Sequence, residues 1–271
     1  MLVIRDEAGL QGLRRSAARL AFVPTMGNLH AGHASLIALA RQHADTVLAS
    51  IYVNPLQFGP NEDFVRYPRS FERDIELVEA AGAQAVFAPD DALLGVSHQR
   101  VFVEPSPLAD DLCGQSRPGH FRGVATIVLK LLHLVKPDVL ILGKKDLQQF
   151  VIVREMLADL NLAIDLIGAP IVRDRDGLAL SSRNQYLTAA ERAEAPHLYR
   201  CLKAVAESAA PAQMLETTRK ELENAGWRVD YVALRDADTL QPIQGGRLVA
   251  LGAAWLGSTR LIDNVELLNS V

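Results

Sequence analysis

Cysteine is scarce in this sequence: only Cys113 and Cys201 occur among 271 residues, far apart and outside any Cys-x-x-Cys pattern. A disulfide framework and a zinc–thiolate site are therefore not expected, and two thiols of this kind fit a reducing cytoplasm. We expect both cysteines to be incidental to function.

Long apolar runs and a basic surplus are also missing. No uncharged apolar stretch of about 18 residues, such as a transmembrane helix needs, occurs in the chain. Charge at Arg5 and Asp6 leaves no room for the apolar core of a signal peptide. The formal net charge is −4, whereas nucleic-acid-binding domains are usually basic. We therefore expect a cytoplasmic protein with no membrane and no nucleic-acid partner.

Short apolar runs alternate with amphipathic stretches through the first two thirds of the chain. Such runs suit strands that are buried on both faces of a parallel sheet. The alternation predicts an α/β fold with a Rossmann-like, doubly wound parallel sheet. The expected strands are 21–25, 47–53, 85–88, 139–142 and 163–167, and the expected helices are 32–44, 70–81, 124–135 and 147–160.

The pattern changes near Arg173, where a polar, turn-rich segment begins and a tight turn is expected at Asp176 and Gly177. Thr188 followed by Glu191 reads as a capping box that starts a helix. We predict a larger Rossmann-like domain over 1–176 and a smaller C-terminal α+β domain over 177–271 that closes over it. In the smaller domain the expected helices are 188–209 and 212–225, and the expected strands are 229–235, 248–255 and 260–264.

A histidine pair lies where the first of these strands leads into a helix, in the stretch FVPTMGNLHAGH. His30 and His33 are three residues apart near the helix start and would share one face. Gly27 and Gly32 would let the backbone approach a phosphate, which the positive end of a helix attracts. Three interpretations stay open: a phosphate site, a His-x-x-His metal site that lacks an evident third ligand, and a polar cap. The glycines favour phosphate.

Two further motifs are polar. Asn54 and Gln57 follow the second predicted strand, and their amides suit a substrate with hydroxyl and carboxylate groups, although an Asn-Pro turn is the plain alternative. The segment RPGHFRG precedes an apolar helix, where its basic side chains would hold an anion or belong to a surface loop. These side chains are Arg117, His120 and Arg122.

Phosphate-binding chemistry recurs after the fourth predicted strand. At this junction Lys144 or Lys145 would bind phosphate as a point charge, and Asp146 would orient it or hold a metal-bound water. The plain alternative is that one lysine is solvated and Asp146 caps the helix. Ser181, Ser182 and Arg183 resemble a clamp for a polyphosphate tail. Ligands of doubly wound sheets bind at the carboxyl ends of the strands. The motifs therefore converge on one cleft, as a nucleotide-activating enzyme requires.

Five motifs occur in order along the chain: PTMGNLHAGH, NPLQF, RPGHFRG, GKKDLQQ and DGLALSSRN. Together they closely resemble the pantoate–β-alanine ligase (pantothenate synthetase) family. HAGH is similar to the HIGH motif of α/β-type nucleotidyltransferases, and LRDADTLQPI and AAWLGSTRLIDN extend the resemblance over essentially the whole chain. Lys144 stands where many members of the family have glutamate, which changes the local charge and leaves the chemistry intact.

The resemblance implies a homodimeric, ATP-binding ligase of pantothenate biosynthesis, on the coenzyme A pathway, with ATP as substrate and Mg²⁺ as cofactor. The carboxylate of (R)-pantoate would attack the α-phosphate of ATP to give pantoyl adenylate and pyrophosphate. The amine of β-alanine would then attack the acyl adenylate and release AMP and pantothenate. By this resemblance residues 1–176 would bind ATP and pantoate, and residues 177–271 would form a lid.

The resemblance also implies site residues. His33, His30 and Lys145 would be catalytic, with His33 as the usual candidate for proton donor. Gln57 and Gln149 would bind pantoate, Gln57 also lying near β-alanine. Metal ligands stay unassigned, with Asp63, Asp74 and Asp146 as candidates. The nucleotide-binding set would be Met26, Gly27, Asn28, Leu29, His30, Ala31, Gly32, His33, Gly143, Lys144, Lys145, Asp146, Val172, Leu180, Ser181, Ser182 and Arg183.

Three rival functions compete with this assignment. One is another nucleotidyltransferase of the same fold. The second is a histidine-dependent metallohydrolase, which would bind zinc and need no ATP. The third is a nucleotide-binding regulator without turnover, which would tolerate loss of the histidines.

Overall fold

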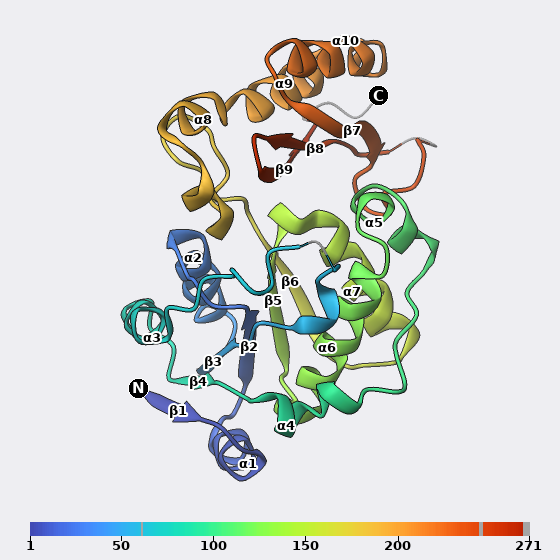
Figure 1. Ribbon diagram of the computed structural model, residues 1–271. Helices are drawn as coiled ribbons and strands as arrows, with labels where there is room; N and C mark the ends of the chain where they lie inside the picture. The colour runs from blue at the N-terminus through green and yellow to red at the C-terminus, as the bar shows by residue number, and fades with distance from the viewer. Residues whose placement is uncertain (61, 244–245, 268–271) are drawn as a thin grey trace. The chain divides into compact units, whose positions relative to one another are not determined.

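A computed structural model describes residues 1–60, 62–243 and 246–267, and in it the chain forms two compact units (Figure 1). The first unit comprises Met1–Lys144 and Ile152–Pro170, and the second comprises Lys145–Val151 and Ile171–Val271. The return to the second unit at Ile171 comes ahead of the expected boundary at 176 and 177.

The first unit contains a six-stranded parallel sheet with the order β1-β4-β3-β2-β5-β6. This confirms the doubly wound α/β architecture. The edge strand β1 was not predicted, because three residues are too few to show a period. The strands are β1 (Leu2–Ile4), β2 (Leu20–Thr25), β3 (Thr46–Ile51), β4 (Ala85–Phe87), β5 (Val139–Gly143) and β6 (Asp165–Ala169).

Helices cover both faces of this sheet. Helix α2 packs beside α3, and α1 packs against α6; right-handed crossovers in opposite directions along the sheet put the two pairs on opposite faces. Helix α6 begins at His120 and not at 124, because its polar first turn hides the apolar period. The helices are α1 (Glu7–Ser16), α2 (Ala31–Ala40), α3 (Phe71–Ala80), α4 (Asp91–Leu94), α5 (Cys113–Ser116), α6 (His120–Val135) and α7 (Leu147–Asp159), with 3-10 turns at Pro55–Gln57, Val96–His98, Pro107–Asp110 and Lys144–Asp146.

The sheet opens between β2 and β5. The ladder between these strands ends at Phe22, whereas the ladder between β2 and β3 continues to Thr25. The Leu20 carbonyl accepts a hydrogen bond from the Asp138 N–H, so the backbone of Leu20 faces β5. Every second residue of a strand faces the same neighbouring strand, so the backbone of Pro24 faces β5 as well. Because proline has no N–H to donate, the ladder stops there. Chain connections leave β2 and β5 in opposite directions, and doubly wound sheets bind their ligands at such a point.

The second unit is an α+β structure, as expected. Its antiparallel sheet has the order β7-β8-β9. The capping box of Thr188 and Glu191 is confirmed. The single helix predicted over 188–209 is wrong: two helices form, because Pro196 cannot donate a backbone hydrogen bond inside a helix. The elements are the 3-10 turn Ser182–Tyr186, α8 (Ala189–Glu194), α9 (His197–Glu207), α10 (Pro211–Asn224), β7 (Arg228–Asp236), β8 (Leu248–Leu256) and β9 (Thr259–Glu266).

Each unit has its own hydrophobic core. In the first, Val23, Ile37 and Ile141 join the sheet to α2 and are fully buried. In the second, Leu202 of α9 and Leu222 of α10 pack with residues of the antiparallel sheet. Burial of each such side chain contributes about 1.5–3 kcal/mol, so these cores fix the loops that emerge from the strand and helix ends.

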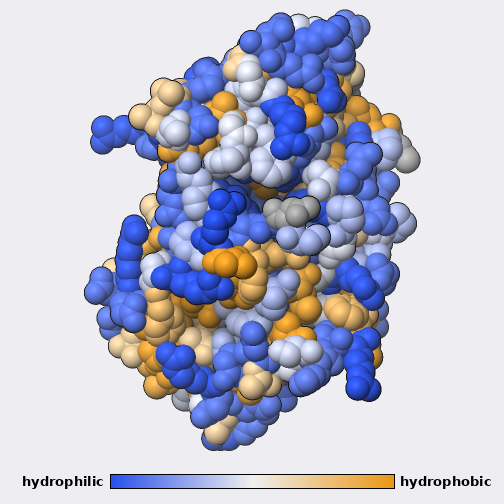
Figure 2. Space-filling view, in the orientation of Figure 1, coloured by the Kyte–Doolittle hydropathy of each residue, from blue (hydrophilic) through white to orange (hydrophobic). Residues whose placement is uncertain are grey.

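Hydrophilic side chains cover much of the face drawn in Figure 2, with hydrophobic side chains gathered in patches between them. Among the described residues, no helix has the length and apolar content that crossing a membrane would need.

Candidate active site

The histidine pair closes the N-terminus of α2. Nδ1 of His30 accepts a hydrogen bond from the Gly32 N–H at 3.1 Å, and Nδ1 of His33 accepts one from the His30 N–H at 3.3 Å. The ring centroids are 4.2 Å apart. The two rings thus form a reciprocal cap on orphan N–H groups of the helix. The polar-cap interpretation therefore accounts for Nδ1 of each ring and not for Nε2.

The cap fixes the tautomer of both rings. Because Nδ1 accepts in each case, a neutral imidazole carries its proton on Nε2. Two N–H donors beside the positive end of a helix suit an anion such as phosphate. Capping and phosphate binding are therefore compatible. In the described part of the chain, the group of three potential metal ligands that lie together does not include these two histidines.

A buried carboxylate holds the loop that precedes this helix. Asp74, only 1% exposed, accepts hydrogen bonds from the N–H groups of Asn28 and Leu29 at 2.9 and 2.7 Å and from the Ser70 hydroxyl at 3.1 Å. Gly27 has φ +79°, and a Cβ there would lie 3.0 Å from Asp74 Oδ2. These contacts engage both carboxylate oxygens of Asp74 and give it a structural role in holding the loop.

Gln57 is held on the loop after β3. Asn54 donates from Nδ2 to Gln57 Oε1 at 3.0 Å and to the Gly123 carbonyl at 3.3 Å. Gln57 Nε2 in turn contacts Met26 Sδ at 3.1 Å. A Cβ on Gly123 would come within 2.0 Å of the Leu56 carbonyl oxygen, so only glycine allows α6 to approach this turn. The structure therefore joins the predicted pantoate residue to the predicted ATP loop.

The RPGHFRG segment braces the same loop. Arg117 donates to Glu62 at 2.9 and 2.5 Å and lies 2.9 Å from His120 Nε2. Since arginine only donates, Nε2 of His120 accepts and its Nδ1 donates to the Gln57 carbonyl at 2.8 Å. His120 and Arg122 belong to the first turn of α6 and not to a loop. Arg122 pairs with an exposed acid and stacks on a phenylalanine ring. These contacts favour a structural role for the segment.

A cavity of about 630 Å³ lies beside Met26 and Gly27 in the first unit. Of its other walls the sequence had singled out Asp74, as a candidate metal ligand, but not Tyr52 or Arg69. Burial, and after it the bond to Asp91, raises the pKa of the Tyr52 hydroxyl far above its ordinary value. The full lining is Met26, Gly27, Ile51, Tyr52, Val53, Phe64, Arg69, Ser70, Phe71, Asp74, Pro89, Asp90, Asp91 and Ala92.

In the second unit, Arg173 ties the turn-rich segment to β9. Its guanidinium donates to both carboxylate oxygens of Asp263, at 2.6 and 2.8 Å, and to the Gly177 carbonyl at 3.0 Å. It also lies 3.8 Å from the Tyr199 ring centroid. Burial raises the pKa of the Asp263 carboxyl, and the paired guanidinium opposes that rise. A bidentate pair of this kind fixes geometry as well as charge.

The next residue of β9 holds the lysine loop. Asn264 Nδ2 donates to the Lys145 carbonyl at 3.1 Å. On the other segment, the Leu180 N–H bonds to the Val172 carbonyl at 3.0 Å, and the Ser181 hydroxyl accepts from the Arg183 N–H at 3.3 Å. Consecutive residues of β9 therefore anchor the two segments that carry the predicted lysine and serine–arginine clamp. Sequence reasoning missed this support, because its partners lie far apart in the chain.

The predicted site residues divide between the units. The first unit holds the α2 loop, Gln57 and the end of β5 with Gly143 and Lys144; the second holds Lys145, Asp146, Gln149 and the segment from Val172 to Arg183. Lys145 Nζ lies 3.9 Å from Asp146 Oδ1. Within each unit these are the donor groups that an anionic, phosphorylated ligand requires: imidazole and helix N–H groups in one, ammonium, hydroxyl and guanidinium groups in the other.

Known proteins share this sequence and fold. The family described as Pantoate-beta-alanine ligase matches residues 3–266. The pantothenate synthetase of Thiobacillus denitrificans is 52% identical over 98% of this chain and 97% of its own length. A crystal structure of pantothenate synthetase from Thermus thermophilus superimposes with a TM-score of 0.91 at 41% identity, covering 98% of this chain and 99% of that one.

A third relative was crystallised with ligands. It is the pantoate-beta-alanine ligase from Francisella tularensis, complexed with beta-gamma ATP and β-alanine. Its TM-score is 0.85 at 33% identity, with 99% of this chain and 98% of that chain covered. From its motifs, its fold and these matches along nearly its whole length, the chain belongs to the pantoate–β-alanine ligase family.

Proposed function

We propose that this protein condenses (R)-pantoate with β-alanine, at the expense of ATP, to give pantothenate, AMP and pyrophosphate through a pantoyl-adenylate intermediate. The observation that carries the proposal is the histidine-capped N-terminus of α2 in a chain that matches this family from residue 3 to residue 266. The protein is thus a carbon–nitrogen ligase of the AMP-forming kind, and ATP is its substrate.

The first step transfers an adenylyl group to the pantoate carboxylate. A carboxylate is a poor acyl donor because oxide cannot leave, and adenylation replaces that oxide with a good leaving group. Negative charge grows on the phosphates as pyrophosphate departs. In our proposal Nε2–H of His30 and His33 donates to those oxygens, aided by the dipole of α2. The reciprocal cap contributes by holding both donors in position before the substrate binds.

The second step forms the amide. The neutral β-alanine amine attacks the acyl carbon of the adenylate, AMP leaves with the bonding electron pair, and the nitrogen releases a proton to solvent. No protein nucleophile takes part, so positioning carries the catalysis. Gln57 would orient pantoate from the loop that Asn54 and His120 brace, and Gln149 would assist. Lys145 with Ser181, Ser182 and Arg183 would hold the triphosphate.

We propose Mg²⁺ as the metal that accompanies ATP. Mg²⁺ commonly binds through one or two carboxylates, waters and the phosphates themselves. Asp146 fits this requirement, because its side chain is half exposed and adjoins the proposed triphosphate lysine. Asp74 does not fit, since three donors already occupy its oxygens. When bound, the metal would neutralise charge on the polyphosphate.

We further propose that residues 177–271 act as a lid over the ATP- and pantoate-binding domain of residues 1–176. The support is that the chain divides into two compact units and that each carries some of the proposed ATP ligands. A smaller radius of gyration in small-angle scattering with ATP than without it would agree with closure, whereas identical curves would contradict it.

A homodimer in the cytoplasm remains our prediction for the assembly and location of the protein. The location is supported by two buried thiols, Cys113 and Cys201, in a chain with no Cys-x-x-Cys pattern. Light scattering after size-exclusion chromatography measures the assembly, and the mass of a single chain, 29.5 kDa, would contradict the dimer.

The function is tested by the substrate dependence of AMP release. We expect AMP at catalytic enzyme levels only when ATP, pantoate and β-alanine are all present. When β-alanine is omitted, we expect a single burst of pyrophosphate, one molecule per active site, and we expect this burst only when pantoate is present. Sustained pyrophosphate release without pantoate would indicate a different adenylyl acceptor. Full activity against an unrelated ester or amide without ATP would favour the metallohydrolase.

A further inference from the structure

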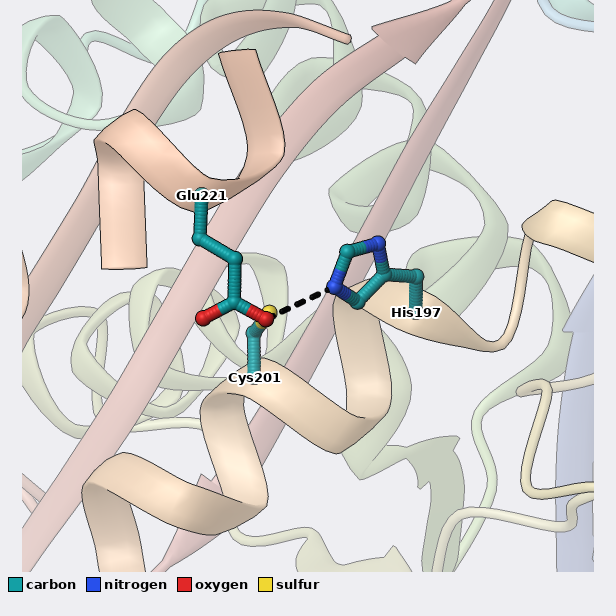
Figure 3. Close-up of side chains that lie close together, drawn as sticks. All are labelled: His197, Cys201 and Glu221. Carbon is teal, nitrogen blue, oxygen red and sulfur yellow. Dashed lines mark hydrogen bonds and ion pairs between the residues drawn. The ribbon is translucent and has the colours of Figure 1, made fainter. Parts of the chain in front are cut away.

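Three potential metal ligands meet in the second unit, on helices that carry none of the proposed ATP-binding residues. His197 and Cys201 lie one turn apart on α9, and Glu221 projects toward them from the adjacent helix α10 (Figure 3). One ligand atom from each lies within 4.8 Å of those of the other two. The cluster therefore unites an imidazole, a thiol and a carboxylate at one point.

The spacing of these atoms is close to what a tetrahedral ion needs. Nε2 of His197 lies 2.9 Å from Oε1 of Glu221. With Zn–N and Zn–O bonds of about 2.0–2.1 Å and a Zn–S bond of about 2.3 Å, neighbouring ligand atoms lie about 3.3–3.6 Å apart. Small side-chain rotations would bring the three atoms to these distances, because the two helices that carry them already pack together.

A further carboxylate orients the imidazole. Nδ1 of His197 lies 2.7 Å from Oε1 of Glu194, and the same oxygen accepts a hydrogen bond from Trp227 Nε1 at 3.0 Å. Metal-binding histidines usually donate their second N–H to a carboxylate in this way, which leaves the other nitrogen for the metal. Glu194 and Trp227 thus provide the support that such a ligand has in established zinc sites.

One side of the cluster is accessible to solvent. Cys201 is 4% exposed, whereas the Glu221 side chain is 57% exposed. A metal ion could enter from the glutamate side and keep a water as its fourth ligand, as sites with three protein ligands do. A thiol as buried as that of Cys201 is poorly placed to react with a large electrophile, so metal binding is the chemistry that the cluster favours over nucleophilic attack.

We propose that His197 Nε2, Cys201 Sγ and a Glu221 carboxylate oxygen bind one divalent transition-metal ion of the Zn²⁺ class. The ion would replace the proton on the Cys201 thiol, so metal uptake releases a proton to solvent. It would clamp α9 to α10 and take no part in amide formation.

The expectation of incidental cysteines is revised for Cys201. The signal in the sequence was the spacing of His197 and Cys201 by one helical turn. A site of this kind needs no Cys-x-x-Cys pattern, the absence of which had led us to expect incidental cysteines.

Cobalt provides the direct test. The full-length protein, stripped with a chelator and transferred to metal-free buffer, is titrated with Co²⁺ alone and then with Zn²⁺. We expect a thiolate-to-Co²⁺ charge-transfer band in the near ultraviolet that saturates at one equivalent and disappears when Zn²⁺ displaces the cobalt. Zn²⁺ should also raise the melting temperature of the stripped protein.

Matched variants locate the ligands. Glu221→Gln and Cys201→Ser should each weaken Co²⁺ binding by at least about tenfold. Glu207→Gln, on the exposed side of α9, and Cys113→Ser, in the other unit, should bind as the unaltered protein does. Glu221→Gln changes an exposed side chain and keeps its shape, so it serves if Cys201→Ser does not fold.

Three results would overturn the proposal. The first is no sulfur-to-metal band at stoichiometric Co²⁺. The second is a band of unchanged affinity in Glu221→Gln. The third is a band lost in Cys113→Ser and retained in Cys201→Ser. None of these outcomes bears on the ligase assay, which measures AMP and uses other residues, so the two proposals fail separately.

Discussion

The carboxylate of Asp74 accepts the backbone N–H of Leu29 at 2.7 Å, across 45 residues of sequence. Leu29 directly precedes His30, so this bond sets the path of the chain as it enters the capped helix. A buried carboxylate that accepts several N–H groups is held by strong, charge-assisted hydrogen bonds. The position of the histidine pair therefore depends on a residue of α3 that need not touch substrate.

Asp74→Asn tests this dependence. The amide retains one acceptor oxygen but turns an NH₂ group toward a backbone donor, which leaves a buried donor unsatisfied. We expect a loss of about 1–3 kcal/mol in the free energy of unfolding and a fall in kcat/KM. Denaturant titration and the AMP assay measure the two effects. Glu72→Gln, an exposed change on the same helix, is the control, and equal behaviour of the two variants would contradict the role of Asp74.

The two nitrogens of His33 can be separated by substitution. An asparagine side chain is shorter than histidine, and its amide oxygen can take the place of Nδ1, so His33→Asn should keep the cap and lose the Nε2–H donor. We expect kcat/KM to fall on the order of 10²–10³-fold in His33→Asn, as for loss of a donor to developing charge, with little change in melting temperature. His33→Ala should lose activity and also about 1 kcal/mol of stability. Wild-type kcat/KM in His33→Asn would remove the catalytic role.

Local patterns predicted much of this fold, and distant pairings account for what they missed. The strand–helix alternation located β2, α2 and β5, and the Thr188–Glu191 spacing located a helix start. Each of these signals lies within a few consecutive residues. The support of Leu29 by Asp74 could not be read in the same way, because nothing in the local sequence of α3 shows which loop an acid will face.

The candidate site shows the same division. The motifs with His30 and Lys145 were visible as residue types after predicted strands, and Ser181 was visible in the polar segment between the two predicted domains. The pairing of Arg173 with Asp263 spans 90 residues, and an arginine followed by aspartates reads equally well as a solvated turn. Single-sequence reasoning therefore identified groups suited to phosphate and missed the residues that hold them.

Two glycines give opposite predictions for the same substitution. A Cβ on Gly123 would lie 2.0 Å from the Leu56 carbonyl oxygen, whereas a Cβ on Gly12 of α1 would meet nothing within 4 Å. Gly123→Ala must push α6 away from the turn that carries Gln57, at a cost of about 1–3 kcal/mol. Gly12→Ala should be neutral or stabilise the helix by up to about 1 kcal/mol.

The same pair also separates stability from function. Because Gly123→Ala displaces Gln57, we expect its KM for pantoate to rise, while Gly12→Ala leaves KM unchanged. Thermal unfolding and pantoate titrations of the AMP assay measure both quantities. A Gly123→Ala protein with the stability and KM of Gly12→Ala would show that the close approach of α6 is not needed.

Acid should weaken the turn that precedes the serine–arginine clamp. Arg192 donates to Asp176 at 2.5 Å and to Asp174 at 2.6 Å. Its hydrogen bond is the main reason that the pKa of the Asp176 carboxyl lies below the ordinary 3.8. For Asp174 the backbone N–H of Arg175 lowers the pKa most, and the Arg192 guanidinium adds to it. Both carboxylates are therefore ionised more readily in the folded protein than in the unfolded chain.

The sign of the pH effect follows from these lowered pKa values. Where the unfolded chain binds more protons than the folded one, stability rises with pH. The contribution of the pairs is complete above the ordinary pKa of 3.8 and is lost as pH falls through the lowered folded values. Arg192→Gln should therefore reduce the free energy of unfolding near neutral pH and make progressively less difference in acid.

Denaturant titrations of both proteins from neutral pH to below 3.8 measure this difference. Lys203→Gln is the control, because Lys203 faces Glu207 at 3.6 Å on the exposed side of α9, and an exposed pair of that kind contributes little. Its difference from the unaltered protein should stay small at every pH. If the Arg192→Gln difference instead remained constant into acid, the substitution would be acting through packing alone, and the two carboxylates would not depend on the guanidinium for their ionisation.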